Sequence, residues 1–173
     1  MKTIKIEPVK RTIKEIIIHC SATETKPGSR PITIADIRRW HKARGFSDVG
    51  YHYYIRLDGT IEVGRPLSLA GAHCKGHNAN SIGICYEGGI LHGKPCDTRT
   101  PIQRARMLEL ILALLTLFDI KSIHGHNEFA NKACPCYDVS KEYKRLNEIL
   151  RMPGDSKEAA KSSLEYYYRC MTM

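Results

Sequence analysis

One apolar run, Ile16-Ile17-Ile18, constrains the fold more than any other part of this 173-residue sequence. β-Branched residues favour strands, and a strand that is apolar on both faces belongs inside a sheet that is covered on both sides. The run therefore predicts a buried central strand that ends at His19. The segment SIGICYEG predicts a second core strand, in which Cys85 acts as a small apolar residue.

Helix signals lie between the strand signals. Thr33 and Asp36 resemble a capping box, and Gly45 is expected to end the helix that they begin. Ile37 and Trp40 belong to the apolar stripe of this helix. We therefore expect Trp40 in the core rather than in a sugar-binding surface.

Turn-forming residues divide the remaining segments. Asp58-Gly59 lies between two β-prone runs and predicts a hairpin with a type I′ turn. Residues 66–80 and the segment GGILHGKPCDTRT predict loops. Further helices are expected after Thr100 and Asp138, because each of these residues can cap one. Since strands and helices alternate, we expect an α/β fold, a single domain with a central mixed β-sheet flanked by helices.

Charge and cysteine content argue against several classes of protein. The net charge is +9, but the basic residues are dispersed in short clusters, so we expect solvated surfaces rather than a nucleic-acid-binding site. No apolar run is long enough to span a bilayer, and the N-terminal sequence lacks the features of a secretory signal. We therefore expect synthesis in the cytoplasm and no membrane insertion. Seven cysteines, an odd number, argue against a disulfide framework.

The segment HGHNEFANKACPC concentrates groups that bind metals or act as nucleophiles. Zinc prefers nitrogen and sulfur ligands, and a catalytic zinc site takes about three of them from the protein. His126 and Cys134 can supply two, and His19 at its strand end is a third candidate. On the residues alone, alternatives stay open. His19 can be a hydrogen-bonded structural histidine, Cys134 a buried residue or a nucleophile with a histidine base, and Lys132 a surface lysine.

Four segments carry a resemblance to a known family. They are IIIHCSAT, IRRWHKARGFSDVGYHYYIRLDGTIEVGR, AHCKGHNANSIGICYEGG and HGHNEFANKACPCYD. In this order they resemble the zinc N-acetylmuramoyl-L-alanine amidases, above all the small lysozyme-like amidases of phages. The animal peptidoglycan recognition proteins are more distant relatives. The resemblance covers roughly residues 12–144.

The resemblance implies a set of roles for individual residues. It makes His19, His126 and Cys134 the ligands of one Zn²⁺ per chain, and Tyr51 and Lys132 the catalytic residues. The implied substrate is peptidoglycan, and the implied reaction is hydrolysis of the amide between the lactyl group of N-acetylmuramic acid and L-alanine. Lys132 would stabilise the oxyanion of this reaction.

Further residues are assigned from the same resemblance and from their surroundings. His73 and Asn80 match positions that the family uses near the substrate, so we expect both to contact it. Because metal-bound histidines donate their other ring hydrogen to an acceptor, Glu128 is a candidate for that acceptor. His52 is expected in the core.

Two further expectations concern the function and extent of the chain. A non-catalytic peptidoglycan-binding module on the same fold is the alternative function, and the presence of Cys134 and Tyr51 favours the enzyme. A role in binding a polymerase is not predicted. We expect a zinc amidase domain at residues 12–152 and a C-terminal tail at 153–173, helical or mobile. The enzyme would act on the cell wall after holin-type release, with a cytoplasmic recycling enzyme as the alternative.

Overall fold

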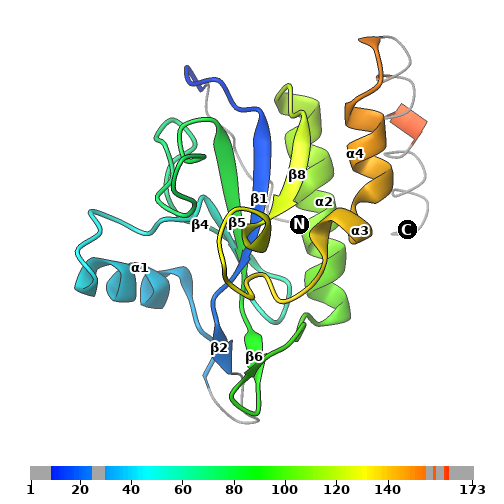
Figure 1. The fold of residues 1–173 in the computed structure, drawn as a ribbon. Helices are drawn as coiled ribbons and strands as arrows, with labels where there is room; N and C mark the ends of the chain where they lie inside the picture. Colours follow the sequence, from blue (N-terminus) through cyan, green and yellow to red (C-terminus); the bar gives the residue numbers. More distant parts are fainter. Residues whose placement is uncertain (1–8, 25–29, 155–157, 159–161, 164–173) are drawn as a thin grey trace.

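The computed structural model describes residues 9–24, 30–154, 158 and 162–163. A five-stranded mixed sheet with the order β4-β3-β5-β1-β8 lies at its centre (Figure 1). In this sheet β1 (Glu15–Cys20) pairs in parallel with β5 (Ser81–Tyr86) on one side and with β8 (Ser122–Gly125) on the other. Every residue of β1 after Glu15 is buried, which confirms the predicted buried strand and extends it by one residue beyond His19.

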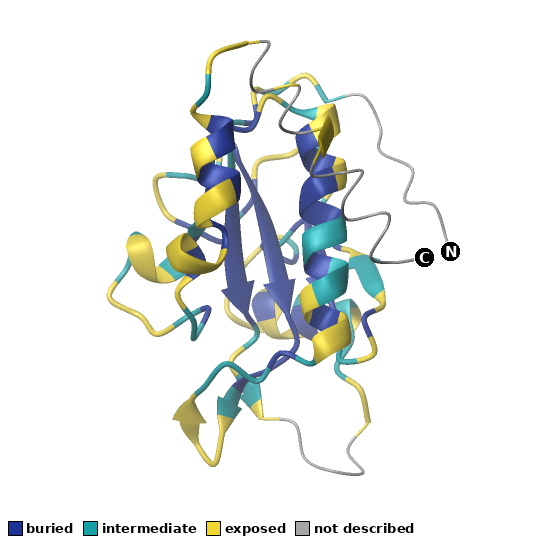
Figure 2. Cartoon of the chain, turned by 90° about the vertical axis from the view of Figure 1, so that its right-hand side faces the viewer, coloured by how far each residue is buried: buried dark blue, intermediate teal, exposed yellow. Residues whose placement is uncertain are grey.

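Helices cover both faces of the sheet. On one side lies α1 (Ile34–Ala43), and on the other lie α2 (Pro101–Leu117), α3 (Val139–Glu142) and α4 (Lys144–Leu150) (Figure 1). The helices are buried mainly on the side that faces the strands, and the central strands β1 and β5 are buried along most of their length (Figure 2). The predicted α/β class, with a mixed sheet between helices, is thus confirmed.

The larger core joins β1 and β5 to α2 and α4. Its members include residues from all four elements: Ile16, Ile18, Ile82, Ile84, Met107, Ile111, Leu114, Leu146 and Leu150. A smaller cluster on the opposite face joins Ile37 of α1 to Tyr54 and Cys85 of the sheet. Successive residues of a strand point to opposite faces. Ile16 and Ile18 therefore belong to the larger core, whereas His19 points to the other face.

The start of α1 agrees with the prediction, and its apolar stripe does not. The Asp36 carboxylate accepts a hydrogen bond from the backbone N–H of Thr33 at 3.0 Å, and the chain leaves the helix through Gly45 at φ +87°. Ile37 is 2% exposed, but Trp40 is 38% exposed. The expectation that Trp40 lies in the core is therefore wrong. The stripe points toward the sheet, but only its earlier part reaches the core.

The hairpin of β3 (Tyr53–Ile55) and β4 (Ile61–Val63) forms where it was predicted, with a different turn. A type I′ turn needs positive φ at both central residues. Gly59 has φ +80°, but Asp58 is not among the residues with positive φ. Arg56 and Thr60 are joined by a 2.9 Å backbone hydrogen bond, so the loop contains three residues and ends in a left-handed glycine.

A small second sheet corrects another prediction. The segment expected to be a loop contains β6 (Gly89–Leu91) and β7 (Lys94–Pro95), and β6 also pairs in parallel with β2 (Thr23–Glu24). Its two turn residues, His92 and Gly93, have φ of +50° and +73°, which is the type I′ pattern.

The C-terminal part is described only in places. The predicted tail at 153–173 lies largely outside the described residues, so its helical or mobile character and the domain boundary stay predictions. Within the described part of the chain, no helix is both long and apolar enough to cross a membrane.

Candidate metal centre

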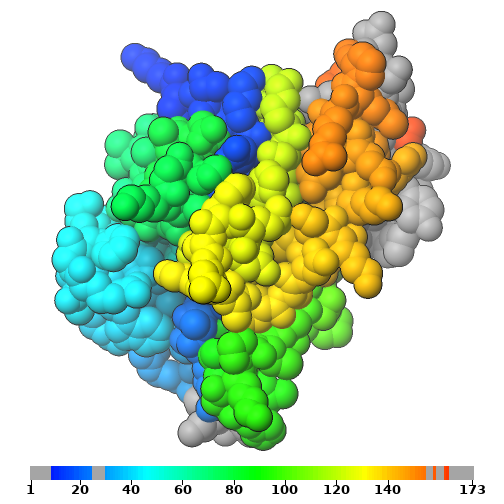
Figure 3. Space-filling view, in the orientation of Figure 1, coloured from blue at the N-terminus to red at the C-terminus, as the bar shows by residue number. Residues whose placement is uncertain are grey.

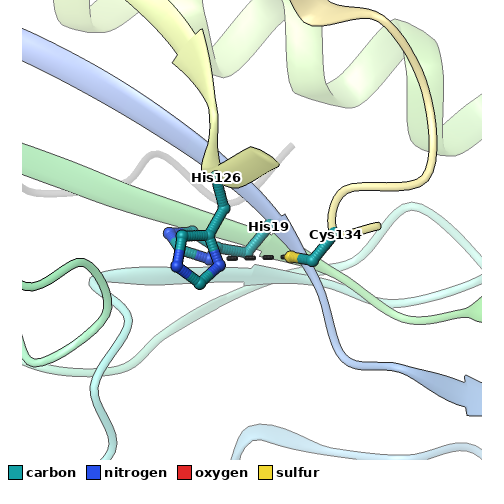
Figure 4. Close-up of side chains that lie close together, drawn as sticks. All are labelled: His19, His126 and Cys134. Atoms are coloured by element: carbon teal, nitrogen blue, oxygen red, sulfur yellow. Dashed lines mark hydrogen bonds between the residues drawn. The ribbon is translucent and has the colours of Figure 1, made fainter. Parts of the chain in front are cut away.

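Two histidines and a cysteine meet at the end of the sheet. Donor atoms of His19, His126 and Cys134 all lie within 4.8 Å of one another (Figure 4). The Cys134 Sγ atom is 3.8 Å from His19 Nδ1, and the imidazole rings of His19 and His126 have centroids 4.5 Å apart. The structure therefore brings together the three predicted ligands.

Strand pairing explains why these residues meet. The carboxyl ends of parallel strands share one edge of a sheet, and Ile18 of β1 is paired with Gly125 of β8. His19 and His126 follow directly on these two partners, so the register places them side by side. His126 opens a short 3-10 helix, η1 (His126–Glu128). The loop after η1 returns to β1, where the backbone N–H of Cys20 donates to Cys134 Sγ at 3.3 Å.

The surroundings keep the histidines neutral. His19 is 1% exposed, and burial lowers its pKa well below the ordinary value of 6.5, with further lowering by the charges of His73, His126 and Lys132. Burial, followed by the charge of Lys132, also lowers the pKa of His126. Neutral imidazole is the form that binds a metal ion, so both rings are ready ligands.

A cavity of about 410 Å³ adjoins the cluster at His126, which is the one candidate ligand among its lining residues. Its walls include residues of the loop at 66–80 and of the segment after β8: His73, Lys75, Asn78, His126, Phe129 and Lys132. Phe46, which follows α1, also lines the cavity. Figure 3 shows the segment after β8 in yellow at the molecular surface, next to the cyan segment that follows α1.

The two predicted catalytic residues lie at this site. Lys132 is exposed and lines the cavity. The Tyr51 ring has its centroid 5.1 Å from that of His19. Burial is the main cause that raises the pKa of Tyr51 well above 10, so its phenol is protonated at neutral pH.

The two predicted substrate contacts are placed differently from each other. His73 lines the cavity but is only 9% exposed, and its Nδ1 atom lies 3.0 Å from His19 Nε2. Asn80 is not among the residues that line the cavity, and its backbone carbonyl accepts hydrogen bonds from the N–H groups of Lys14 and Glu15. Its contact with substrate stays a prediction.

Three other residues near the site have structural roles, and sequence reasoning did not single out one of them, Asn78. Asn78 lines the cavity, and its Oδ1 accepts from the backbone N–H of His73 at 2.8 Å. In the sequence it differs from Asn80 only by its place in the loop. Glu128 contacts His124 at 2.7 Å and accepts from the backbone N–H of Gly125, so it is not the acceptor behind a ligand histidine. His52 is fully buried, as predicted.

Two imidazoles and one thiol are nitrogen and sulfur donors of the kind that bind zinc. Three protein ligands are typical of catalytic zinc sites, whereas structural zinc sites usually take four. Residues 9–137 match a family model described as N-acetylmuramoyl-L-alanine amidase. The chain therefore belongs to the N-acetylmuramoyl-L-alanine amidase family, and it is an amide hydrolase of peptidoglycan. The predicted enzyme class is confirmed.

Individual relatives agree with this assignment. The endolysin of Enterobacteria phage T3 is 39% identical over 151 residues, which cover 87% of this chain and 97% of the relative. The endolysin of Escherichia phage T7 is 42% identical over 136 residues, covering 78% and 87%. The solved structure of N-acetylmuramoyl-L-alanine amidase LysC from Clostridium intestinale is similar with a TM-score of 0.68 and 29% identity, covering 85% of this chain and 95% of that one.

Proposed function

We propose that the chain is a zinc-dependent amidase in which His19, His126 and Cys134 hold one Zn²⁺. Its reaction would be hydrolysis of the amide between the lactyl group of N-acetylmuramic acid and L-alanine in peptidoglycan. The observation that carries the proposal is the convergence of three donor atoms within 4.8 Å, with His126 at the wall of a cavity. Nitrogen and sulfur donors suit Zn²⁺, and three protein ligands leave room for water or substrate.

The residues around the site support this chemistry. When bound, the ion would supply Lewis-acid chemistry, making water more acidic and polarising a carbonyl group. The protonated phenol of Tyr51 can both donate and accept a hydrogen bond beside His19. Lys132 presents a positive charge at the cavity wall, where it can stabilise the negative charge that develops on the substrate carbonyl oxygen.

Product analysis tests the bond that is cut. Purified protein is incubated with peptidoglycan, and the soluble products are identified by mass spectrometry. We expect free peptides with an N-terminal L-alanine. New reducing sugar ends would contradict the proposal, and binding without any release of peptide would favour the non-catalytic module.

Variants test the assigned residues. Cys134→Ala should lose both bound zinc and activity, because one of three protein ligands is removed. Cys96→Ala is the matched control, since Cys96 is a partly exposed cysteine outside the ligand group. Lys132→Ala should keep zinc and lose most turnover. An unchanged rate would remove Lys132 from the mechanism.

The cellular route can be tested separately. The endolysins among the relatives support action on the cell wall. Synthesis in the cytoplasm followed by holin-type release stays a prediction. Expression with and without a co-expressed pore protein would test it, because only the combined expression should lyse the cells.

A further inference from the structure

His73 lies directly behind the candidate metal centre. Its ring connects His19 to Ser81: Nδ1 is 3.0 Å from His19 Nε2, and Nε2 is 3.3 Å from Ser81 Oγ. All three residues are buried, with exposed fractions of 1% for His19, 9% for His73 and 0% for Ser81. The ring nitrogens of His73 are thus both engaged by protein atoms.

The Ser81 hydroxyl, at the far end of this series of hydrogen bonds, determines the direction of each of them. The Ser81 hydroxyl donates to the backbone carbonyl of His77 at 2.7 Å, and a carbonyl can only accept. Ser81 Oγ must therefore accept from His73, so the ring hydrogen of His73 is on Nε2. The His73 ring is buried between the rings of His19 and His52, and burial disfavours a charged imidazole. With its single hydrogen on Nε2, His73 has no hydrogen on Nδ1, which accepts from His19 Nε2.

This order of donors fixes the tautomer of His19. With its single hydrogen on Nε2, His19 carries a lone pair on Nδ1. Nδ1 is the nitrogen that faces the Cys134 sulfur at 3.8 Å. The chain of hydrogen bonds therefore directs a lone pair into the three-ligand cluster, and no step of this deduction requires an ion to be present.

Two glycines leave the space in which the His73 ring lies. A Cβ atom on Gly71 would be 2.3 Å from His73 Cδ2, and one on Gly83 would be 2.5 Å from the same atom. Both separations are far below van der Waals contact. The backbone N–H of His73 is also held by Asn78 Oδ1 at 2.8 Å. The position of the ring is thus determined by the strand, by the loop and by its hydrogen bonds.

We propose that His73 is a positioning residue, which orients His19 and holds it in the tautomer that binds the metal, and that it does not serve mainly as a substrate contact. This inference rests on the proposed function, because it takes His19 to be a ligand. Loss of such a partner typically lowers metal affinity by about 10- to 100-fold.

Zinc affinity tests the role, measured by competition with a chromophoric chelator. His73→Leu removes the acceptor and should weaken zinc binding by about 10- to 100-fold. His73→Asn is the matched control, because its Oδ1 can occupy the place of Nδ1, and it should bind zinc nearly as tightly as the wild type. Ser81→Ala should show a smaller loss than His73→Leu. Equal zinc affinity for His73→Leu and the wild type would overturn the proposal.

Two further measurements separate positioning from other roles. Steady-state kinetics of His73→Asn should show a KM close to that of the wild type, whereas a raised KM with unchanged zinc affinity would indicate a substrate contact. In the metal-free wild type, long-range ¹H–¹⁵N NMR should show the hydrogen of His19 on Nε2. A hydrogen on Nδ1 would refute the inference. If the wild type failed to bind zinc, the proposed function would fail, but this NMR result would still decide the tautomer.

Discussion

Arg99 offers a direct test of how the loop that carries Cys134 is anchored. Its side chain is fully buried and forms two hydrogen bonds to each of two carboxylates. It donates to Asp97 at 2.9 and 2.9 Å and to Glu142 at 2.8 and 2.6 Å. Its guanidinium carbon lies 3.3 Å from the ring centroid of Tyr137, which follows the loop. Arg99 therefore ties the end of α3 and the exit of the loop to the segment before α2.

The expected cost of Arg99→Met follows from these contacts. Removing one partner of a buried ion pair destabilises a protein by about 3–5 kcal/mol. Asp97 and Glu142 are 22% and 31% exposed, and Arg104 still reaches both, so we expect the lower end, about 3 kcal/mol. At about 2–4 °C per kcal/mol for a chain of this size, Tm should fall by about 6–12 °C.

Urea and thermal unfolding of the metal-free protein measure this effect without a contribution from bound zinc. Arg104→Met is the matched control. Arg104 also contacts Asp97, at 2.7 Å, but is 47% exposed. Such an exposed pair contributes about 1 kcal/mol or less. If Arg99→Met were as stable as Arg104→Met, the anchoring role of the buried guanidinium would be refuted.

Three other changes have expected outcomes. Gly83→Ala should lower the free energy of unfolding by about 1–3 kcal/mol and weaken zinc binding, because the new Cβ would lie 2.5 Å from His73 Cδ2. A variant as stable as the wild type in urea would contradict this close packing. In urea titrations, Trp40→Ala should lower the free energy of unfolding by less than about 0.5 kcal/mol, whereas Ile37→Ala should lower it by about 2–5 kcal/mol. Equal losses of stability would place Trp40 in the core after all. Burial is the main cause that lowers the pKa of His52 from 6.5 to about 4, so the unfolded chain takes up a proton there at higher pH than the folded chain. The contribution of neutral His52 to the free energy of unfolding should therefore be fully present above pH 6.5 and should be lost as the pH falls to about 4. In a series of unfolding curves at different pH, His52→Asn should weaken this dependence of stability on pH.

Local sequence signals predicted the central strands and the main helices. The choice of His19, His126 and Cys134 as metal ligands rested on the resemblance to the amidases, and their role as ligands stays a prediction. The apolar run before His19 predicted a buried strand, and the spacing of His126 and Cys134 allowed a shared ion. Strand pairing then decides which strand ends meet. No local sequence signal identified His73 as the hydrogen-bond partner of His19. His73 reaches His19 from a loop whose path depends on Asn78 and on nearby glycines.

The errors have physical causes of the same kind. A helical stripe gives the direction of the core, not how far the core extends, so Trp40 was misplaced. A single Asp-Gly pair is compatible with more than one turn, whereas the type I′ turn forms at His92-Gly93, where the strand β2 supports the hairpin from a distant part of the chain. In the hairpin of β6 and β7, pairing with a distant strand accompanies a turn that the local sequence did not predict.

The parallel pairing of β1 has a consequence for the order of folding. Glu15 is matched with Ser81 on one side and with Ser122 on the other, so the strand that carries His19 gains its neighbours only after long chain loops have closed. Topologies dominated by such distant pairings fold slowly, because loop-closure entropy precedes the stabilising contacts. We therefore expect the donor cluster to assemble only after these pairings have formed, so an ion added during refolding should not accelerate the pairing of the strands.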